Sequence, residues 1–190
     1  AMADAVAHFI RRIGVDNIFE GDIYITNDPW EGTGHLHDFT VVTPAFHRGK
    51  HVGFLGCTAH IVDIGGRGFG ADANSIYEEG LYVPIMKFAN KGEVDKTLIN
   101  IVRANVREPD QAVGDFYALS SCNEIGQRRL VAMMTEFDLT HLDDIANFIL
   151  ENSRRATLEC IAALPRAKAK CEMRIAGYIH QVDLTVSLDI

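Results

Sequence analysis

Two apolar runs separated by a short polar segment constrain the fold of this sequence more than any other feature. Residues 39–46 and 52–59 are typical of β-strands, because they are short, mainly apolar runs on either side of a turn-forming segment. The five residues between them, His47–His51, have a glycine at their centre, as a hairpin loop often does. The sequence therefore predicts a β-hairpin around which the rest of the chain is organised.

The register of this hairpin brings polar side chains together at its open end. Symmetry about Gly49 predicts that Asp38 lies opposite His60. Directly opposed residues have Cβ atoms about 5 Å apart, so these two side chains can hold one ion. Pairs of threonines across strands are favoured, and the same register predicts one. The further predicted pairs are Thr40 with Thr58 and Phe46 with Val52.

A third polar side chain enters the same end of the hairpin from a glycine-rich approach. His35 stands three residues before Asp38, so a turn can fold its imidazole back toward the carboxylate. Together with His60 these residues form a plausible ligand set for Zn²⁺, Mn²⁺ or Fe²⁺, with positions left open for water or substrate. The alternative is an aspartate and a histidine that only hydrogen-bond to close the hairpin. Spacing alone does not separate these two interpretations.

Composition limits the classes of protein to which the chain can belong. With 190 residues, 47% hydrophobic and 23% charged, the chain can bury a sizeable core in one or two domains. Its net charge of -8 argues against general binding to nucleic acids or anionic membranes. The four cysteines show no C-x-x-C spacing, which favours reduced thiols in a cytoplasmic protein.

The apolar patterns indicate an α+β fold with strands first, a helical block from about 95 to 170, and a strand at the end. Residues 81–88 are interrupted by Pro84 and predict an edge strand or an extended connector. Both ends of the chain lack capping or pairing partners, so we expect one segment, 1–190, of a larger domain that continues on both sides. The other predicted elements are a helix over 1–13 that ends at Gly14, a strand over 22–26, helices that begin near Asp95, Pro109 and Thr140, and a strand over 181–190.

Five residues in the connecting loops each allow a functional and a structural interpretation. Asp28 could bind a metal or a histidine, or it could hydrogen-bond its own backbone in a turn, which is the commoner role. Trp30 could line a pocket or pack under a loop. Asp63 could orient an imidazole or cap its loop, and Glu79 could act as an acid or base if its loop folds over the metal. Arg67 suits an anionic substrate group but is equally consistent with a solvated arginine.

Several kinds of catalysis are poorly supported. The chain has no Gly-x-Ser-x-Gly motif and no cysteine-protease motif, which argues against acyl-enzyme chemistry. Cys57 falls on the hairpin face opposite to Asp38 and His60, so we expect it in the packed interior. Metal-assisted chemistry remains, in which an ion polarises a carbonyl, stabilises an enolate or lowers the pKa of a water to about 7.

Several motifs in order along the chain resemble those of the hydantoinase B family. This family includes the B subunits or domains of ATP-dependent N-methylhydantoinases, 5-oxoprolinases and caprolactamases, and related subunits of acetone and acetophenone carboxylases. The resemblance runs over nearly the whole chain. The motifs are Asn27-Asp28-Pro29-Trp30, Gly34-His35-Leu36-His37-Asp38, Ala59-His60-Ile61-Val62-Asp63-Ile64-Gly65-Gly66, Tyr77-Glu78-Glu79-Gly80-Leu81, and Ala104-Asn105-Val106-Arg107 with Gly114-Asp115.

The resemblance implies a divalent-metal site and a partner subunit. It implies that His35, Asp38 and His60 are the metal ligands, and that a further aspartate precedes residue 1. It also implies a hydantoinase A-type partner that binds ATP with Mg²⁺, and hence a hetero-oligomer. The family usually has a proline between the leucine and the aspartate of its His-x-x-Asp motif, whereas this chain has His37, an extra imidazole that bears on the identity of the metal.

Three functions follow from the resemblance. The first is the metal-bearing subunit of an ATP-dependent hydrolase that opens a hydantoin, 5-oxoproline or lactam ring, after the partner has phosphorylated the amide oxygen. The second is a subunit of an ATP-dependent ketone carboxylase, in which the ion would hold an enolate. The third is a scaffold for assembly without catalysis of its own.

Overall fold

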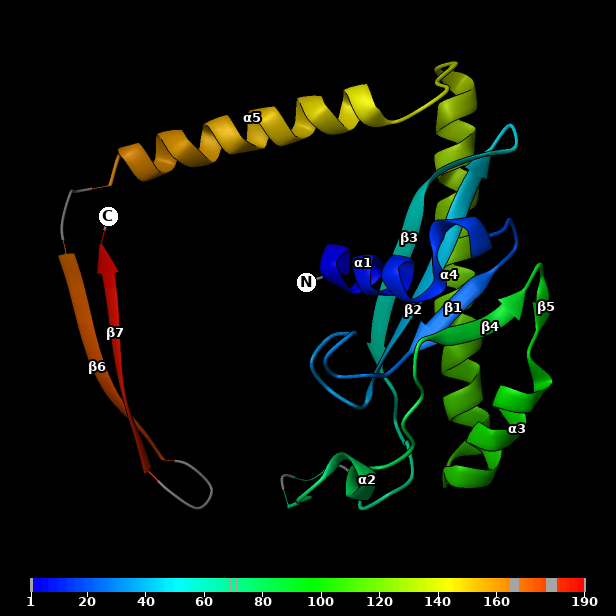
Figure 1. The fold of residues 1–190 in the computed structure, drawn as a ribbon, viewed down its shortest axis with the longest axis horizontal. Coiled ribbons are helices and arrows are strands. Elements are labelled where there is room, and N and C mark those ends of the chain that lie inside the picture. Colours follow the sequence, from blue (N-terminus) through cyan, green and yellow to red (C-terminus); the bar gives the residue numbers. More distant parts are fainter. Residues whose placement is uncertain (1, 69, 71, 165–167, 177–180, 190) are drawn as a thin grey trace. The chain divides into compact units, whose positions relative to one another are not determined.

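The structure is a computed structural model that describes residues 2–68, 70, 72–164, 168–176 and 181–189, with side chains as far as residue 164. The chain divides into two compact units, residues 1–141 and residues 142–190, which are described separately below. The larger unit contains a sheet with helices on its two faces, and the smaller contains one helix and one hairpin (Figure 1).

The sheet of the larger unit has five strands, all paired antiparallel. Their order is β3-β2-β1-β4-β5, so the predicted hairpin, β2 with β3, lies at one edge of the sheet. This mixed α and β architecture agrees with the α+β prediction. The strands are β1 (Ile23–Thr26), β2 (Asp38–His47), β3 (Lys50–His60), β4 (Met86–Asn90) and β5 (Glu93–Val94).

The predicted hairpin register is confirmed at the open end and wrong at the turn. Asp38 pairs with His60 and Thr40 with Thr58, as symmetry about Gly49 predicts. Near the turn, however, Phe46 pairs with His51 and not with Val52, because the loop contains only Arg48 and Gly49. Both loop residues have positive φ, 51° and 75°, as a two-residue type I′ turn requires. The extra residue is accommodated by a bulge between Ala45 and Phe46.

Helices cover both faces of the sheet (Figure 1). The helix α1 (Met2–Ile13) ends at Gly14, whose φ of 80° suits a C-terminal cap, and packs Phe9 against Tyr24 and Val42. On the other face lie α3 (Lys96–Asn105) and α4 (Pro109–Glu136). Alternation along β2 divides its residues between the two faces. Phe39 contacts the ring of Phe116 on α4, with centroids 4.6 Å apart.

The connection from the hairpin to the helices differs from the prediction. The strand expected over residues 81–88 at an edge is β4, which lies inside the sheet between β1 and β5. Pro84 precedes β4 and so removes no hydrogen bond from the ladder. Two short helices that the sequence did not suggest also occur in the larger unit. They are the 3₁₀ helix η1 (Val15–Asn17) and α2 (Ile76–Glu79).

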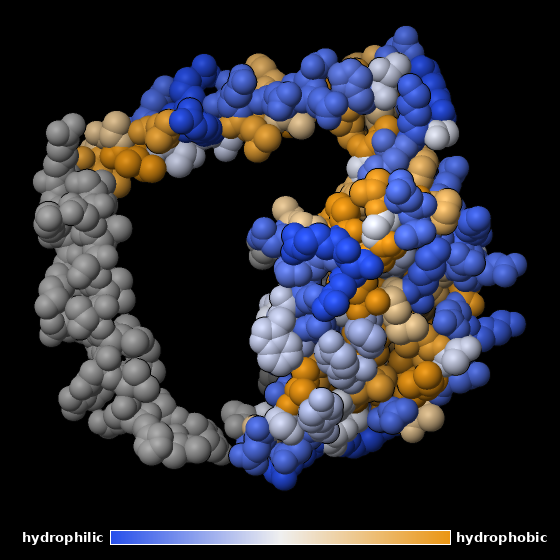
Figure 2. Space-filling view, viewed as in Figure 1, coloured by the Kyte–Doolittle hydropathy of each residue, from blue (hydrophilic) through white to orange (hydrophobic). Residues whose placement is uncertain are grey.

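The smaller unit begins with α5 (Asp143–Ala162), which is hydrophilic along one side and hydrophobic along the other (Figure 2). It continues as a hairpin of β6 (Lys168–Ala176) and β7 (Gln181–Asp189). The predicted final strand is therefore present, and its partner precedes it. The helical block consequently ends at residue 162 and not near 170. Among the described residues, no helix has both the length and the apolar character needed to cross a membrane.

Candidate metal centre

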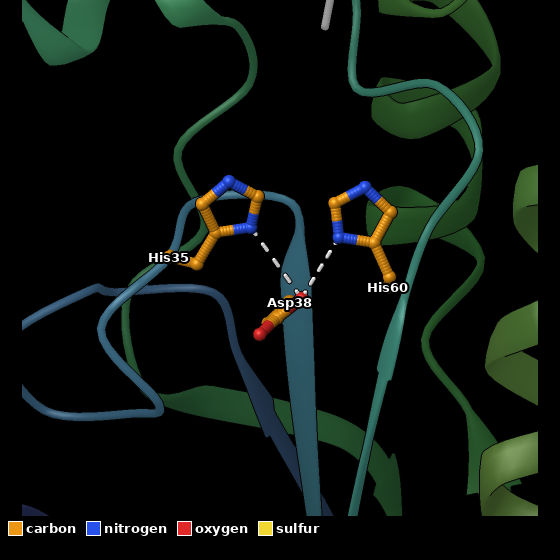
Figure 3. Close-up of side chains that lie close together, drawn as sticks. All are labelled: His35, Asp38 and His60. Carbon is orange, nitrogen blue, oxygen red and sulfur yellow. Dashed lines mark hydrogen bonds and ion pairs between the residues drawn. The ribbon is translucent and has the colours of Figure 1, made fainter.

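Three side chains converge at the open end of the hairpin (Figure 3). His60 Nδ1 lies 3.0 Å from Asp38 Oδ1, and His35 Nδ1 lies 3.5 Å from the same oxygen. One ligand atom from each residue lies within 4.8 Å of the others. The two histidine side chains are nearly half exposed, at 45% and 46%, so the cluster opens to solvent.

The local backbone explains why these side chains meet. Asp38 begins β2 and His60 ends β3, and their pairing places both side chains on one face. The backbone N–H of Asp38 donates to the carbonyl of His35 at 3.1 Å, which closes the turn that folds His35 back. Gly34, with φ of 88°, allows this turn to form. The structure thus brings together all three residues that the sequence predicted as a ligand set.

The spacing of these atoms fits a divalent transition metal. Ligand atoms about 2.1 Å from one ion lie roughly 3.0–3.4 Å apart at octahedral or tetrahedral angles. The separation of 3.0 Å between His60 Nδ1 and Asp38 Oδ1 lies in this range and is also that of a hydrogen bond, whereas the 3.5 Å from His35 Nδ1 lies just outside it. Two imidazoles and one carboxylate suit Zn²⁺, Mn²⁺ or Fe²⁺, with coordination positions left for other ligands.

A third imidazole lies beside the cluster. His37 is 5% exposed, and its ring stacks on those of His35 and His60 with centroid separations of 5.3 and 5.1 Å. Burial, and after it the neighbouring rings of His60 and His35, lower the pKa of His37, so it is neutral at physiological pH. The extra histidine of this sequence is therefore buried and packs against the predicted ligands.

Asp63 lies in the loop that follows β3 and connects this loop to the residues before α4. Its Oδ1 accepts hydrogen bonds from the backbone of Gly65 at 2.9 Å and from Arg107 Nη1 at 2.8 Å. Its Oδ2 accepts from the backbone N–H groups of Arg107 and of Glu108, the latter at 3.1 Å. These bonds correspond to the loop-capping alternative. Burial alone would raise the pKa of Asp63, but the backbone donors and Arg107 lower it overall.

Asp28 takes the turn role that its sequence context favours. Its Oδ1 accepts from the backbone N–H groups of Trp30 and Glu31 at 2.9 and 3.3 Å. Its Oδ2 accepts from the hydroxyl of Tyr82 at 2.7 Å. These bonds hold the backbone of Trp30, while 74% of the Trp30 surface is exposed.

A cavity of about 460 Å³ lies next to the cluster and is lined in part by His35, Trp30, Ile76 and Glu79. Half-buried Glu79, at the end of α2, thus shares a cavity with a predicted ligand. Trp30 lines this cavity and is not packed under a loop. Arg67 is half exposed and pairs with Glu78 at 3.2 Å and Asp72 at 3.6 Å, which agrees with the solvated alternative.

Sequence reasoning missed residues whose roles depend on contacts distant in the sequence. Arg107 was noted within a motif, but nothing in its spacing indicated an ion pair with Asp63. Ile76 lies on the four-residue α2, which is too short to produce a periodic signal. The cysteine prediction agrees with the structure: Cys57 packs against the core, and burial raises the pKa of its thiol to about 12.

Comparison with known proteins gives consistent results. The Hydantoinase B/oxoprolinase family model matches residues 1–190. Caprolactamase subunit beta of Pseudomonas jessenii is 32% identical over 142 residues, which cover 70% of this chain and 24% of that subunit. A 5-oxoprolinase of Dictyostelium discoideum is 26% identical over 192 residues, which cover 100% of this chain and 14% of the relative.

The fold is also similar to a solved structure. The crystal structure of ATP-dependent caprolactamase from Pseudomonas jessenii matches with a TM-score of 0.78 and 27% identity. The match covers 89% of this chain and 30% of that chain. The present chain therefore spans less than a third of the length of each of these three relatives.

Proposed function

The chain belongs to the hydantoinase B/oxoprolinase family, and on this basis we propose that it is the metal-bearing part of an ATP-dependent hydrolase that opens cyclic amides. The observation that carries the proposal is the convergence of His35, Asp38 and His60 within 4.8 Å at the edge of a cavity. A hydantoinase A-type partner would bind ATP and activate the amide. Relatives named as subunits support a hetero-oligomer.

In this proposal the two histidines and the aspartate of the cluster supply different kinds of metal ligand. His35 and His60 each offer a neutral imidazole nitrogen, and Asp38 offers the one carboxylate, which offsets part of the charge of a divalent ion. When bound, such an ion would supply Lewis-acid polarisation of the activated amide and would lower the pKa of a water to about 7. The exposed sides of the two histidines leave this position open to substrate.

Two further residues act around the cluster. We assign Glu79 as the proton acceptor, because its half-buried carboxylate lines the same cavity as His35. Asp63 is a positioning residue, because its four hydrogen bonds hold the loop after β3 against the start of α4. His37 supports the cluster by stacking on both histidine rings.

Metal analysis of the intact protein tests the ligand assignment. We expect one divalent metal ion per chain in the wild type and a marked loss in His35→Ala and His60→Ala. His51→Ala is the matched control, because it removes an exposed imidazole near the turn of the same hairpin. Normal metal content in both site variants would refute the assignment and would favour a scaffold without catalysis.

Assays of the complete complex separate the hydrolase from a ketone carboxylase. The complex should open lactam or hydantoin rings with ATP and without bicarbonate. Turnover of ketones that depends on bicarbonate, with no ring opening, would instead support the carboxylase. Glu79→Gln should lower turnover and keep the metal, since Glu79 is not a ligand in this proposal.

A further inference from the structure

The cavity beside the cluster has a composition that distinguishes between classes of substrate. Its apolar lining includes Trp30, Leu36 and Ile76, and its polar lining includes His35 and Glu79. A volume of about 460 Å³ is within the usual range for small-molecule sites and can hold a small ring. None of its described lining residues is a lysine or an arginine. The only charged carboxylate among them belongs to Glu79.

Three arginines, on α1, in the loop after β3 and just before α4, are paired with carboxylates of the chain itself. Arg12 contacts Glu31 at 2.7 Å, Arg67 contacts Glu78 at 3.2 Å, and Arg107 contacts Asp63 at 2.8 Å. A substrate carboxylate would have to compete with each of these partners. Among its described lining residues, the cavity therefore offers no cationic side chain for an anionic group, although arginine is the residue best suited to bind one.

The charges of the cluster lead to the same conclusion. With a divalent ion bound, as in the proposed function, the carboxylates of Asp38 and Glu79 would offset its two positive charges. The local field then gives an anionic ligand little attraction, and the Glu79 carboxylate repels a second carboxylate in the cavity. An amide N–H, in contrast, can donate to Glu79.

Trp30 is held in a position where it can contact a flat ring. Its backbone N–H donates to Asp28 Oδ1 at 2.9 Å, and Asp28 Oδ2 accepts from Tyr82 at 2.7 Å. These bonds fix the backbone, while the largely exposed indole lines the cavity. An indole face favours apolar or planar uncharged groups.

We infer that this cavity selects uncharged cyclic amides, such as simple lactams and hydantoins, and discriminates against rings that carry a carboxylate, such as 5-oxoproline. This inference rests on the proposed function and narrows it. Trp30 and Ile76 supply the apolar surface, and the negative charge of Glu79 supplies the discrimination.

Calorimetric binding to the intact metal-loaded protein, without ATP and at pH 7.5, tests the inference. The probes are 2-pyrrolidinone, 5-oxoproline and 5-oxoprolinamide, which share one lactam ring. The amide matches the acid in size and lacks its charge, so their ratio isolates the carboxylate. We expect 5-oxoproline to bind at least about tenfold more weakly than 5-oxoprolinamide.

Two variants locate this discrimination in the cavity. Glu79→Gln keeps the shape and removes the charge, so the ratio should fall toward one. Ile76→Arg should strengthen 5-oxoproline binding, whereas Ile76→Met, a neutral control, should leave the ratio near that of the wild type. Circular dichroism of each variant is the control for correct folding.

Three results would overturn the inference. They are equal or tighter binding of 5-oxoproline by the wild type, no measurable binding of any probe, and a ratio that folded Ile76→Arg and Glu79→Gln leave unchanged. If the protein bound no metal and still discriminated between the probes, the proposed function would be refuted and this inference would stand. If the protein bound the metal but did not discriminate between the probes, this inference would be refuted and the proposed function would stand.

Discussion

Asp38 begins β2 and Asp63 follows β3 at the same end of one hairpin, yet their carboxylates have different surroundings. The Asp63 side chain is 8% exposed and accepts four hydrogen bonds, three of them from backbone N–H groups. The Asp38 side chain is 27% exposed and meets two imidazoles and the hydroxyl of Thr33 at 3.4 Å. Backbone donors satisfy the first carboxylate, whereas the second remains available to a cation.

Under the proposed function, the two aspartates of this comparison have different roles. A buried carboxylate with several fixed donors stabilises the fold, because loss of the carboxylate leaves those donors unpaired. A partly exposed carboxylate between two histidines accepts fewer hydrogen bonds from backbone donors and can bind an external ion. Each prediction below tests one side of this comparison.

The largest effect is expected for Asp63→Ala. Four donors would lose their acceptor and Arg107 its partner, so the free energy of unfolding should fall by about 3 kcal/mol. Chemical denaturation measures this change. Asp72→Ala is the control, because exposed Asp72 contacts only Arg67 at 3.6 Å among the described ion pairs, and should cost less than about 1 kcal/mol. Similar effects of the two substitutions would contradict the anchoring role.

Asp38→Ala should show the opposite profile. We expect metal affinity to fall by about 100-fold, measured by competition with a coloured chelator, because a charged ligand is lost. The metal-free variant should unfold within about 1 kcal/mol of the wild type, since few protein donors depend on Asp38. A large loss of stability without metal would indicate that Asp38 is structural.

The free energy of unfolding should depend on the charge of Asp63 at acidic pH. The pKa of Asp63 is lowered in the folded protein, because its hydrogen bonds outweigh the effect of burial. Its stabilisation is therefore fully present above the unfolded value of about 3.9 and is lost as pH falls through the folded value. The stability of Asp63→Asn should decline less steeply below pH of about 4 than that of the wild type. Parallel curves would show that Asp63 does not carry this dependence.

The smallest change is expected for Arg107→Lys. The backbone donors to Asp63 remain, but a lysine cannot reproduce the guanidinium that also contacts the carbonyls of Gly65 and Gly66. Since the Arg107 side chain is 57% exposed, the loss should be about 1 kcal/mol. Thermal unfolding compared with Arg107→Ala checks whether the charge or the fork geometry matters.

Much of the larger unit could be predicted from local patterns. Apolar runs located β2 and β3, helical spacing located α1 and α4, and symmetry about Gly49 predicted the pairing of Asp38 with His60. The turn could not be predicted, because one central glycine allows a five-residue loop as well as the observed two-residue turn at Arg48 and Gly49. The strand β6 was overlooked, although Lys168–Ala176 also alternates in polarity.

The candidate site was predictable only where its residues lie on one hairpin or in the turn directly before it. His35, Asp38 and His60 are linked by local geometry, so their spacing carried the information. Asp63 and Arg107 are 44 residues apart in sequence, and their contact depends on how the loop after β3 meets the start of α4. No local pattern encodes such a contact, which explains why the structural role of Asp63 became evident only in the fold.

Anomalous diffraction at the absorption edge of the bound metal, from crystals of the intact protein, tests the central claim most directly. The account predicts a peak about 2.0–2.3 Å from His35 Nδ1, Asp38 Oδ1 and His60 Nδ1. A peak elsewhere in the protein, or none at this cluster in crystals grown with the metal, would contradict it.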